Sequence, residues 1–311
     1  MDNYRTDLAD ERRDLYRKAN HVAKEIEGVE TTEEQVDDKV KVTRVKITNE
    51  QGEQAIGKVK GNYITIDIKK MNTISEEDIE LAAETLAKEM KHLIEENIQP
   101  KEDILIVGLG NSDVTPDALG PKVIKDIDIT RHIIQYLPQY IDENARPVSA
   151  IAPGVLGTTG IETVEIIKGV VENVKPKLLI VIDALASRSI ERISSTVQLS
   201  DTGIVPGGGV GNTRKEITKN TLGIPVIAVG IPTVVETAVV VNDALDLLIE
   251  KLQEEARSND FLNQLKEEDN YQDIKEALLP KDYNLIVTPK EIDQLIMNMS
   301  SVVARGINKS L

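Results

Sequence analysis

The sequence lacks cysteine and tryptophan altogether, and it has one phenylalanine and three histidines in 311 residues. The absence of cysteine excludes disulfides, thiolate metal ligands and cysteine nucleophiles. Because aromatic side chains are so few, the core must be built from valine, isoleucine, leucine and alanine. A core rich in branched aliphatic residues favours buried parallel strands that are covered by helices.

The sequence also lacks a long apolar run and an excess of basic residues. It has 37 Lys+Arg against 53 Asp+Glu, which gives a net charge of −16. Such a chain is repelled by phosphate backbones, so we expect no direct binding to nucleic acid. No segment has the roughly 18 apolar residues of a membrane-spanning helix, and the opening MDNYRTDLADERRD is too charged for a secretory signal. These patterns predict a soluble, cytoplasmic protein that has no membrane partner.

Apolar runs and helical patterns alternate through the centre of the chain. Strands are predicted at 104–110, 147–154, 178–185 and 225–232, and helices at 161–174 and 238–253. Alternation of this kind is typical of an α/β fold, in which a mainly parallel sheet is sandwiched by helices.

The segments around this centre have different patterns. Residues 1–38 are polar and show only weak helical periodicity. Residues 40–70 predict a small antiparallel β layer. A helix is predicted over 75–96, with Ser75 as its N-cap. Residues 254–282 are polar and charged, and they predict an exposed excursion from the core.

Two aspartates stand at predicted strand ends, where open α/β sheets bind their ligands. The first, Asp117, lies in the loop GLGNSDVTPDALGP, directly after Pro116 and at a predicted helix entry. A carboxylate at that place either caps the helix, because it interacts favourably with free N–H groups, or belongs to a site. Asn111 in the same loop is expected to bond the turn backbone.

The second aspartate, Asp183, follows the apolar run LLIVI. Its neighbours on the strand are therefore buried, and an isolated buried charge is costly, so this carboxylate must be hydrogen-bonded, paired or catalytic. The structural alternative is a salt bridge to Arg188 or Arg192. Two carboxylates that converge on one crevice can divide their roles, one activating water while the other donates a proton to the leaving group.

Glycines and histidines add less specific signals. The loop 203–211 is glycine-rich and either closes over a bound substrate or is a solvent loop without a role. Its consecutive glycines are Gly207, Gly208 and Gly209. The three histidines are His21, His92 and His132. They are too scattered to predict a Ser–His–Asp set or a histidine metal cluster, although two aspartates and one histidine could together hold an ion.

Several ordered blocks of the sequence resemble the spore germination protease family. They include GLGNSDVTPDALGPKV (108–123), AIAPGVLGTTGIETVEII (150–167) and VIDALASRSIERISSTVQLSDTGIVPGGGVGN (181–212). The opening YRTDLADE and the closing LIVTPKEID also look like the ends of that family. The resemblance covers nearly the whole chain and is weakest at 254–280.

The resemblance implies an endopeptidase that degrades small acid-soluble spore proteins at the onset of germination, in the spore core. It also implies a homotetramer and a fold similar to that of the hydrogenase-maturation peptidases. The two aspartates of this atypical aspartic peptidase family fall on Asp117, in TPDALGP, and Asp183, in IDALA. We expect no cofactor and no metal.

The family is made as a zymogen that removes its own N-terminus after an acidic stretch ending in glutamate. Carried over to TDLADE, the resemblance implies that residues 1–11 are a propeptide and that the bond between Glu11 and Arg12 is cut. Arg12 stands where the family more often has an apolar or small residue. Residues 12–311 would then form a single peptidase domain.

Two other functions stay open on the sequence alone. One is a metal-dependent peptidase related to the hydrogenase-maturation proteases, with Asp117, Asp183 and a histidine as ligands. The other is a binding module without catalysis. For the aspartic peptidase we expect acidification to permit cleavage, because two ionised carboxylates lack a general acid and protonation of one supplies it.

Overall fold

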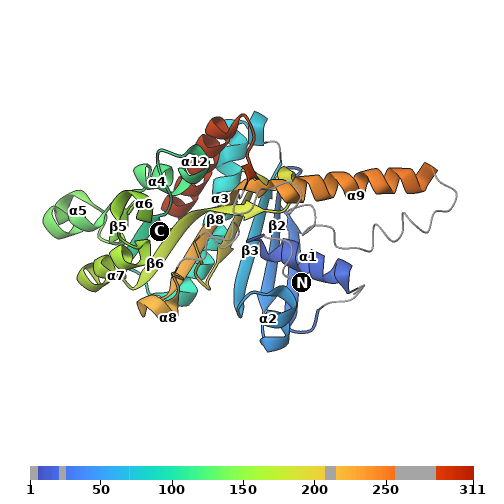
Figure 1. Ribbon diagram of the computed structural model, residues 1–311. Coiled ribbons are helices and arrows are strands. Elements are labelled where there is room, and N and C mark those ends of the chain that lie inside the picture. Colours follow the sequence, from blue (N-terminus) through green and yellow to red (C-terminus); the bar gives the residue numbers. More distant parts are fainter. Residues whose placement is uncertain (1–5, 21–25, 70, 207–214, 256–284) are drawn as a thin grey trace.

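The computed structural model describes residues 6–20, 26–69, 71–206, 215–255 and 285–311 (Figure 1). Within these residues, nine strands form one sheet of order β1-β2-β3-β7-β8-β6-β4-β5, and β9 pairs with β8. The strands are β1 (Val29–Gln35), β2 (Val40–Ile47), β3 (Gly61–Ile68), β4 (Ile104–Gly108), β5 (Val148–Ile151), β6 (Leu178–Ser187), β7 (Thr196–Ser200), β8 (Val226–Glu236) and β9 (Ile286–Val287).

The centre of the sheet is parallel, as the alternation of the sequence predicts. β4 pairs in parallel with β5 and with β6, and β6 pairs in parallel with β8. β4 and the first halves of β6 and β8 are apolar and fully buried, because both faces of a parallel sheet are covered by helices. The structure therefore confirms an α/β fold with a mainly parallel core.

The predicted antiparallel strands at 40–70 are present, but they extend the main sheet. β3 pairs with β7, and β7 pairs with β8, so β1, β2 and β3 continue the parallel part edge to edge. β1 lies in the polar segment 1–38, for which the sequence predicted no strand. Its side chains are mostly charged or polar and exposed, which suits a strand at the edge of a sheet.

Helices cover both faces of the sheet (Figure 1). Side chains of a strand alternate between faces: Ile104 and Ile106 pack with α3, α4 and α12, whereas Leu105 and Val107 pack with α7 and α8. The helices α1 and α2 lie on the same face as α7 and α8, over the antiparallel strands. The helices are α1 (Ala9–Ala19), α2 (Glu50–Ile56), α3 (Glu76–Asn97), α4 (Leu119–Lys125), α5 (Arg131–Tyr136), α6 (Leu156–Thr159), α7 (Thr163–Val174), α8 (Lys219–Leu222), α9 (Thr237–Glu255) and α12 (Ile292–Ser310).

Two local features fix the long helices on the first face. Ser75 caps α3 as predicted: its hydroxyl accepts from the N–H of Asp78, and the Asp78 carboxylate accepts from the N–H of Ser75, both at 3.2 Å. This capping box satisfies two N–H groups at the start of the helix. Where α3 meets α12, a β-carbon at Gly306 would lie 2.6 Å from Cδ2 of Leu86. Glycine at 306 therefore allows the two helices to pack closely.

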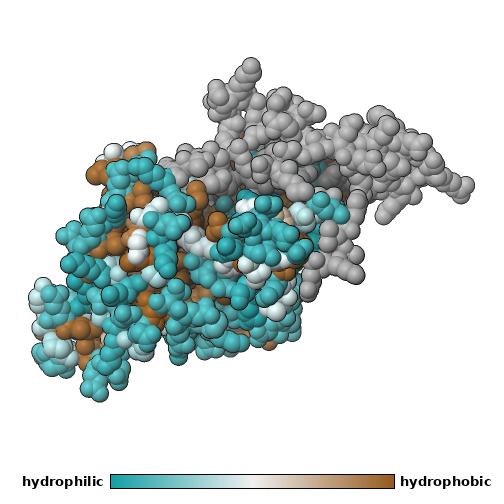
Figure 2. Space-filling model, turned by 90° about the horizontal axis from the view of Figure 1, so that it is seen from below, coloured by the Kyte–Doolittle hydropathy of each residue, from teal (hydrophilic) through white to brown (hydrophobic). Residues whose placement is uncertain are grey.

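The predicted excursion 254–282 falls almost entirely within 256–284, outside the described residues. The coloured part of the face in Figure 2 is mostly hydrophilic, with hydrophobic residues in patches between polar ones. Among the helices of the described ranges, none combines the length and the apolarity that crossing a bilayer requires.

Candidate active site

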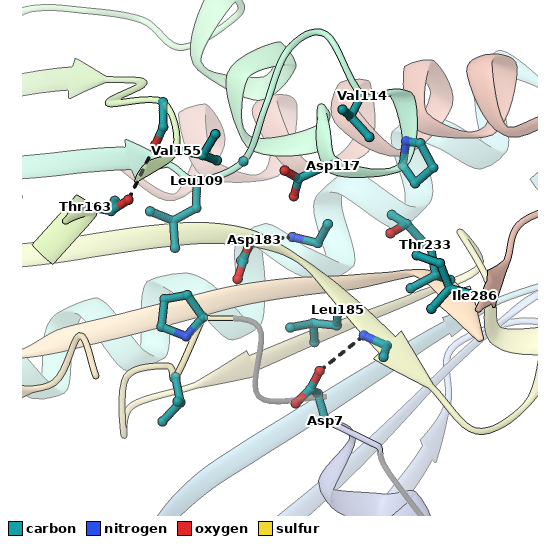
Figure 3. Close-up of a pocket in the computed structure, with 18 residues that line it drawn as sticks. Asp7, Leu109, Val114, Asp117, Val155, Thr163, Asp183, Leu185, Thr233 and Ile286 are labelled. Carbon is teal, nitrogen blue, oxygen red and sulfur yellow. Dashed lines mark hydrogen bonds between the residues drawn. The ribbon is translucent and has the colours of Figure 1, made fainter. Parts of the chain in front are cut away.

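A cavity of about 300 Å³ opens at the carboxyl ends of β4 and β6, and we call it the aspartate cavity. Asp117 and Asp183 both line it, and both carboxyl groups are directed into it (Figure 3). The place agrees with the expectation for an open α/β sheet, where ligands bind beyond the carboxyl ends of the strands. Its other lining residues are Asp7, Leu109, Gly110, Val114, Pro116, Gly154, Val155, Thr163, Ala184, Leu185, Ala186, Val205, Pro206, Thr233, Val234 and Ile286.

Asp117 is held by a loop that folds back on itself. It ends the short 3-10 helix η2 (Thr115–Asp117), and one residue, Ala118, separates it from α4. The N–H of Asn111 donates to the carboxylate of Asp117 at 2.8 Å and to its carbonyl at 3.0 Å. Gly110 has φ +113°, and a β-carbon there would lie 2.0 Å from the Asp117 carbonyl oxygen. Glycine at 110 is therefore required for the closure that places Asp117.

Asn111 supports the same loop in the way its sequence position predicts. Its side-chain oxygen accepts a hydrogen bond from the N–H of Asp113 at 3.0 Å. This contact is an Asx turn, in which the side chain bonds the backbone two residues on. Asn111 thus holds the loop through its side chain and Asp117 through its backbone.

Asp183 occupies a fixed place inside a strand. β4 pairs with β6 only as far as Ile182, while β6 continues to Ser187 along β8. Asp183 is therefore the first residue of β6 beyond the end of β4, where its carboxylate faces the cavity. It is 6% exposed, and its carboxylate accepts from the N–H of Ala184 at 2.9 Å. Opposite it on β8 stands Gly230.

The two arginines that the sequence offered as salt-bridge partners of Asp183 also form ion pairs with other carboxylates. Arg188 pairs with Asp243 of α9 at 3.2 Å. Arg192 pairs with Asp10 at 2.7 Å and lies 3.7 Å from the carboxylate of Glu11. Arg188 therefore connects the end of β6 to α9, and Arg192 connects the segment after β6 to the N-terminal segment.

The N-terminal segment itself enters the site, which the sequence did not predict. The N–H of Asp7 donates to the carbonyl of Ala186 at 3.1 Å, and the carboxylate of Asp7 accepts from the N–H of Ala186 at 3.1 Å (Figure 3). The side chains of Thr6 and Leu8 are fully buried. Asp7 is thus a third carboxylate that lines the aspartate cavity. The acidic, weakly patterned TDLADE gave no signal of burial.

The predicted processing residues lie beside the cavity, inside the first turn of α1. Glu11 is 9% exposed and accepts from the N–H of Arg188 at 3.0 Å and from the hydroxyl of Thr6. Burial raises the pKa of Glu11 above its ordinary value. Arg12 donates to the carbonyl of Thr6 at 2.9 Å and to that of Gly57 at 3.1 Å. Cutting the Glu11–Arg12 bond would therefore require the start of α1 to unwind.

The remaining predicted residues do not meet in the cavity. His92 is exposed on α3, 3.5 Å from Glu96, and His132 is exposed on α5. His21 and the glycines Gly207, Gly208 and Gly209 lie outside the described residues, although Val205 and Pro206, just before those glycines, line the cavity. In the described part of the chain, no three histidine, aspartate or glutamate side chains are grouped so as to hold a metal ion.

Comparisons with known proteins agree on one family. The sequence model of the germination protease family matches residues 6–264 and 254–311. A germination protease of Caldanaerobacter subterraneus is 49% identical over 99% of this chain and 94% of its own length, and one of Clostridium acetobutylicum is 45% identical over 100% and 96%. A germination protease of Geobacillus is 40% identical over 100% of this chain and 94% of its own.

One solved structure is also similar in part. It is the hydrogenase maturation protease HycI from Thermococcus kodakarensis, which matches 45% of this chain and 79% of its own at 19% identity. The TM-score of this match is 0.29. The sequence matches, by contrast, extend from the N-terminal segment in the aspartate cavity to the end of α12, and they confirm the resemblance of the sequence blocks. The chain belongs to the germination protease family.

Proposed function

We propose that this chain is an endopeptidase that begins the degradation of small acid-soluble spore proteins during germination, with Asp117 and Asp183 as its catalytic residues. One observation carries the proposal: both carboxylates face a single cavity, in a chain that matches germination proteases along its whole length. The spore core is the proposed location, and a homotetramer is the proposed assembly.

The proposed reaction uses the two carboxyl groups in different protonation states. The ionised one takes a proton from a water molecule, whose oxygen adds to the peptide carbonyl carbon. The protonated one donates its proton to the amide nitrogen, and the C–N bond breaks to give a carboxylic acid and an amine. When both groups are ionised, the site lacks the acid. Acidification that protonates one of them is therefore the proposed trigger.

The same site is proposed to remove the N-terminal segment. The prediction from the sequence is loss of residues 1–11, which leaves 12–311 as the peptidase domain. Two observations bear on which bond is cut: Asp7 lines the aspartate cavity, and the Glu11–Arg12 bond lies inside α1. The new N-terminus separates these cases, since cleavage after Glu11 leaves Arg12 and cleavage beside Asp7 leaves Asp7 or Leu8.

The test is incubation of the purified chain with a small acid-soluble spore protein, with all new ends mapped by mass spectrometry. Asp117→Asn and Asp183→Asn should fold and should lose at least about 10³-fold in rate, because each removes a group that transfers a proton. Asp113→Asn is the matched control, since Asp113 lies exposed on the same loop and does not line the cavity. Cleavage within a few-fold of wild type by either cavity variant refutes the assignment.

The metal-dependent alternative is tested in the same assay. An aspartic mechanism predicts that the rate is unchanged after treatment with a chelator. Loss of cleavage with chelator, and its return with a divalent ion, would favour the metal-dependent peptidase instead.

A further inference from the structure

The backbone of residues 6–9 is held as a bound peptide would be held. The N–H of Asp7 donates to the carbonyl of Ala186 at 3.1 Å. The side-chain amide of Gln198 donates to the carbonyl of Asp7 at 3.0 Å and accepts from the N–H of Ala9 at 2.7 Å. These bonds engage the main chain and are indifferent to the side chains of the peptide. Main-chain contacts of this kind give affinity to peptide-binding sites, while pockets for individual side chains give specificity.

Gln198 is well placed for this task. It lies on β7 opposite Gly230 of β8, and it is 7% exposed. An amide side chain has both a donor and an acceptor, so one residue can bind a carbonyl and an N–H of the same peptide. Ala186 belongs to the part of β6 that extends past the end of β4. Its N–H and carbonyl are both bonded to Asp7.

Asp7 also lines a second cavity. This cavity, which we call the lysine cavity, has about 290 Å³ and shares Asp7, Leu185 and Val205 with the aspartate cavity. Its cationic lining residues are Arg12 and Lys58. The ammonium of Lys58 lies 5.8 Å from the ring centroid of Tyr63, a distance at which a cation is attracted to the ring face.

Burial and two neighbouring charged groups together set the pKa of Lys58. Burial lowers the pKa of Lys58 to about 8, Asp7 raises it and Arg12 lowers it. Other ionisable groups that line this cavity are Tyr63 and Glu216. Lys58 is therefore mostly cationic at neutral pH and lies within the field of an acidic side chain that reaches the aspartate cavity. The next position along the peptide is apolar, since Leu8 is fully buried.

We propose that the surface under residues 6–9 is the binding site of the peptide substrate, where Gln198 holds the substrate backbone and Lys58 selects an acidic side chain at the position of Asp7. This inference rests on the proposed protease function. The N-terminal segment then occupies the site in the way that a substrate peptide would. Gln198 is a positioning residue, and Lys58 is a specificity residue.

The experiment uses synthetic peptides with the sequence of residues 3–14, cleaved by the purified full-length chain. One peptide has the natural sequence, a second has asparagine for Asp7, and a third is N-methylated at Ala9. The measured quantity is the ratio of kcat/KM between two peptides on the same enzyme. Competition from the chain's own N-terminal segment affects both peptides equally, so it cancels in this ratio.

Wild type should prefer the Asp7 peptide over the asparagine peptide by roughly five- to tenfold, the range for a partly screened contact to a charged group. Lys58→Met should bring this ratio close to one. Lys60→Met should leave it unchanged, because Lys60 is exposed nearby and does not line the cavity. N-methylation should cost wild type at least about fivefold, the effect of one lost hydrogen bond, and Gln198→Leu should remove most of that cost.

The outcomes separate this inference from the proposed function. If wild type cleaves none of the peptides and no spore protein, the protease function fails. If it cleaves the natural peptide and Asp183→Asn does not, the function stands. Equal rates for the Asp7 and asparagine peptides on wild type then overturn the role of Lys58, and this result needs no folded variant. An N-methylation cost that is the same in wild type and Gln198→Leu overturns the role of Gln198.

Discussion

Replacement of Arg192 by methionine should loosen the N-terminal segment from the site. The Arg192 guanidinium lies 2.7 Å from Asp10, 3.7 Å from Glu11 and 3.8 Å from Asp67. The side chains of Asp10 and Glu11 are 3% and 9% exposed, and that of Arg192 is 22% exposed. The substitution leaves three neighbouring carboxylates without the cation that they share.

The size of the effect follows from this burial. Breaking a fully buried ion pair costs about 3–5 kcal/mol, because a charge is left uncompensated, whereas an exposed pair is worth about 0–1 kcal/mol. Arg192 lies between these limits. We therefore expect Arg192→Met to lower the free energy of unfolding by about 2–3 kcal/mol near pH 7.5.

The loss should depend on pH in a definite direction. Burial raises the pKa of Glu11 and of Asp67, and Arg192 lowers both. A carboxyl group whose pKa is raised by folding binds its proton more tightly in the folded chain. Its contribution to stability is full below the unfolded pKa and is lost as the pH rises through the folded pKa. Without Arg192 both pKa values rise further, so the deficit of the variant should be largest near pH 7.5 and smaller near pH 5.

Urea unfolding at the two pH values, with amide hydrogen exchange of residues 6–11, measures both effects. Arg305→Met is the control, because Arg305 pairs with Glu76 and Glu80 on the surface and should cost less than about 1 kcal/mol. The reasoning is refuted if Arg192→Met costs no more than Arg305→Met. It is also refuted if the deficit is the same at pH 5 and at pH 7.5, or if exchange of residues 6–11 is unchanged.

Three further predictions test the rest of the structure. Leu86→Ala should lower the free energy of unfolding by about 3–4 kcal/mol in urea titrations, because Leu86 of α3 is fully buried against α12. A loss under 1 kcal/mol contradicts this packing. Gly120→Ala should reduce peptide cleavage about 100-fold, because its β-carbon would lie 2.3 Å from the Leu109 carbonyl oxygen and would shift the loop of Asp117. The control is Gly169→Ala, whose β-carbon would meet no neighbouring atom within 4 Å and which should leave the cleavage rate unchanged. The preference for the Asp7 peptide over its asparagine form should fall between pH 7 and pH 9, because the pKa of Lys58 is about 8 and the ammonium loses its proton there; a ratio that is constant over this range argues against Lys58.

The parallel core and the two aspartates could be predicted because their signals are local. Apolar runs mark β4, β6 and β8, and the aspartates follow the first two runs in the sequence. Strand ends of a parallel sheet meet at one edge, so the convergence of Asp117 and Asp183 follows from topology. The resemblance assigned the family and these two residues, and the comparisons confirm the family.

The parts that the sequence did not predict depend on contacts between distant segments. Asp7 and Ala186 are 179 residues apart, and Ala9 and Gln198 are 189 apart. The sequence pattern of TDLADE alone does not indicate these contacts with residues so far along the chain. β1 was missed for a related reason, since a polar edge strand is stabilised by its neighbour β2 and has little apolar pattern of its own.

The two candidate catalytic aspartates are held by backbone elements of different rigidity. Asp183 stands within a strand that is paired along β8, so its main chain cannot shift without breaking the sheet. Asp117 stands on a short turn that is closed by Gly110 and Asn111. The distance between the two carboxyl groups therefore changes only when Asp117 moves. Hydration, assembly or loss of the N-terminal segment could each change this distance. Any such change has to move the loop 110–117 relative to β6, which stays in place.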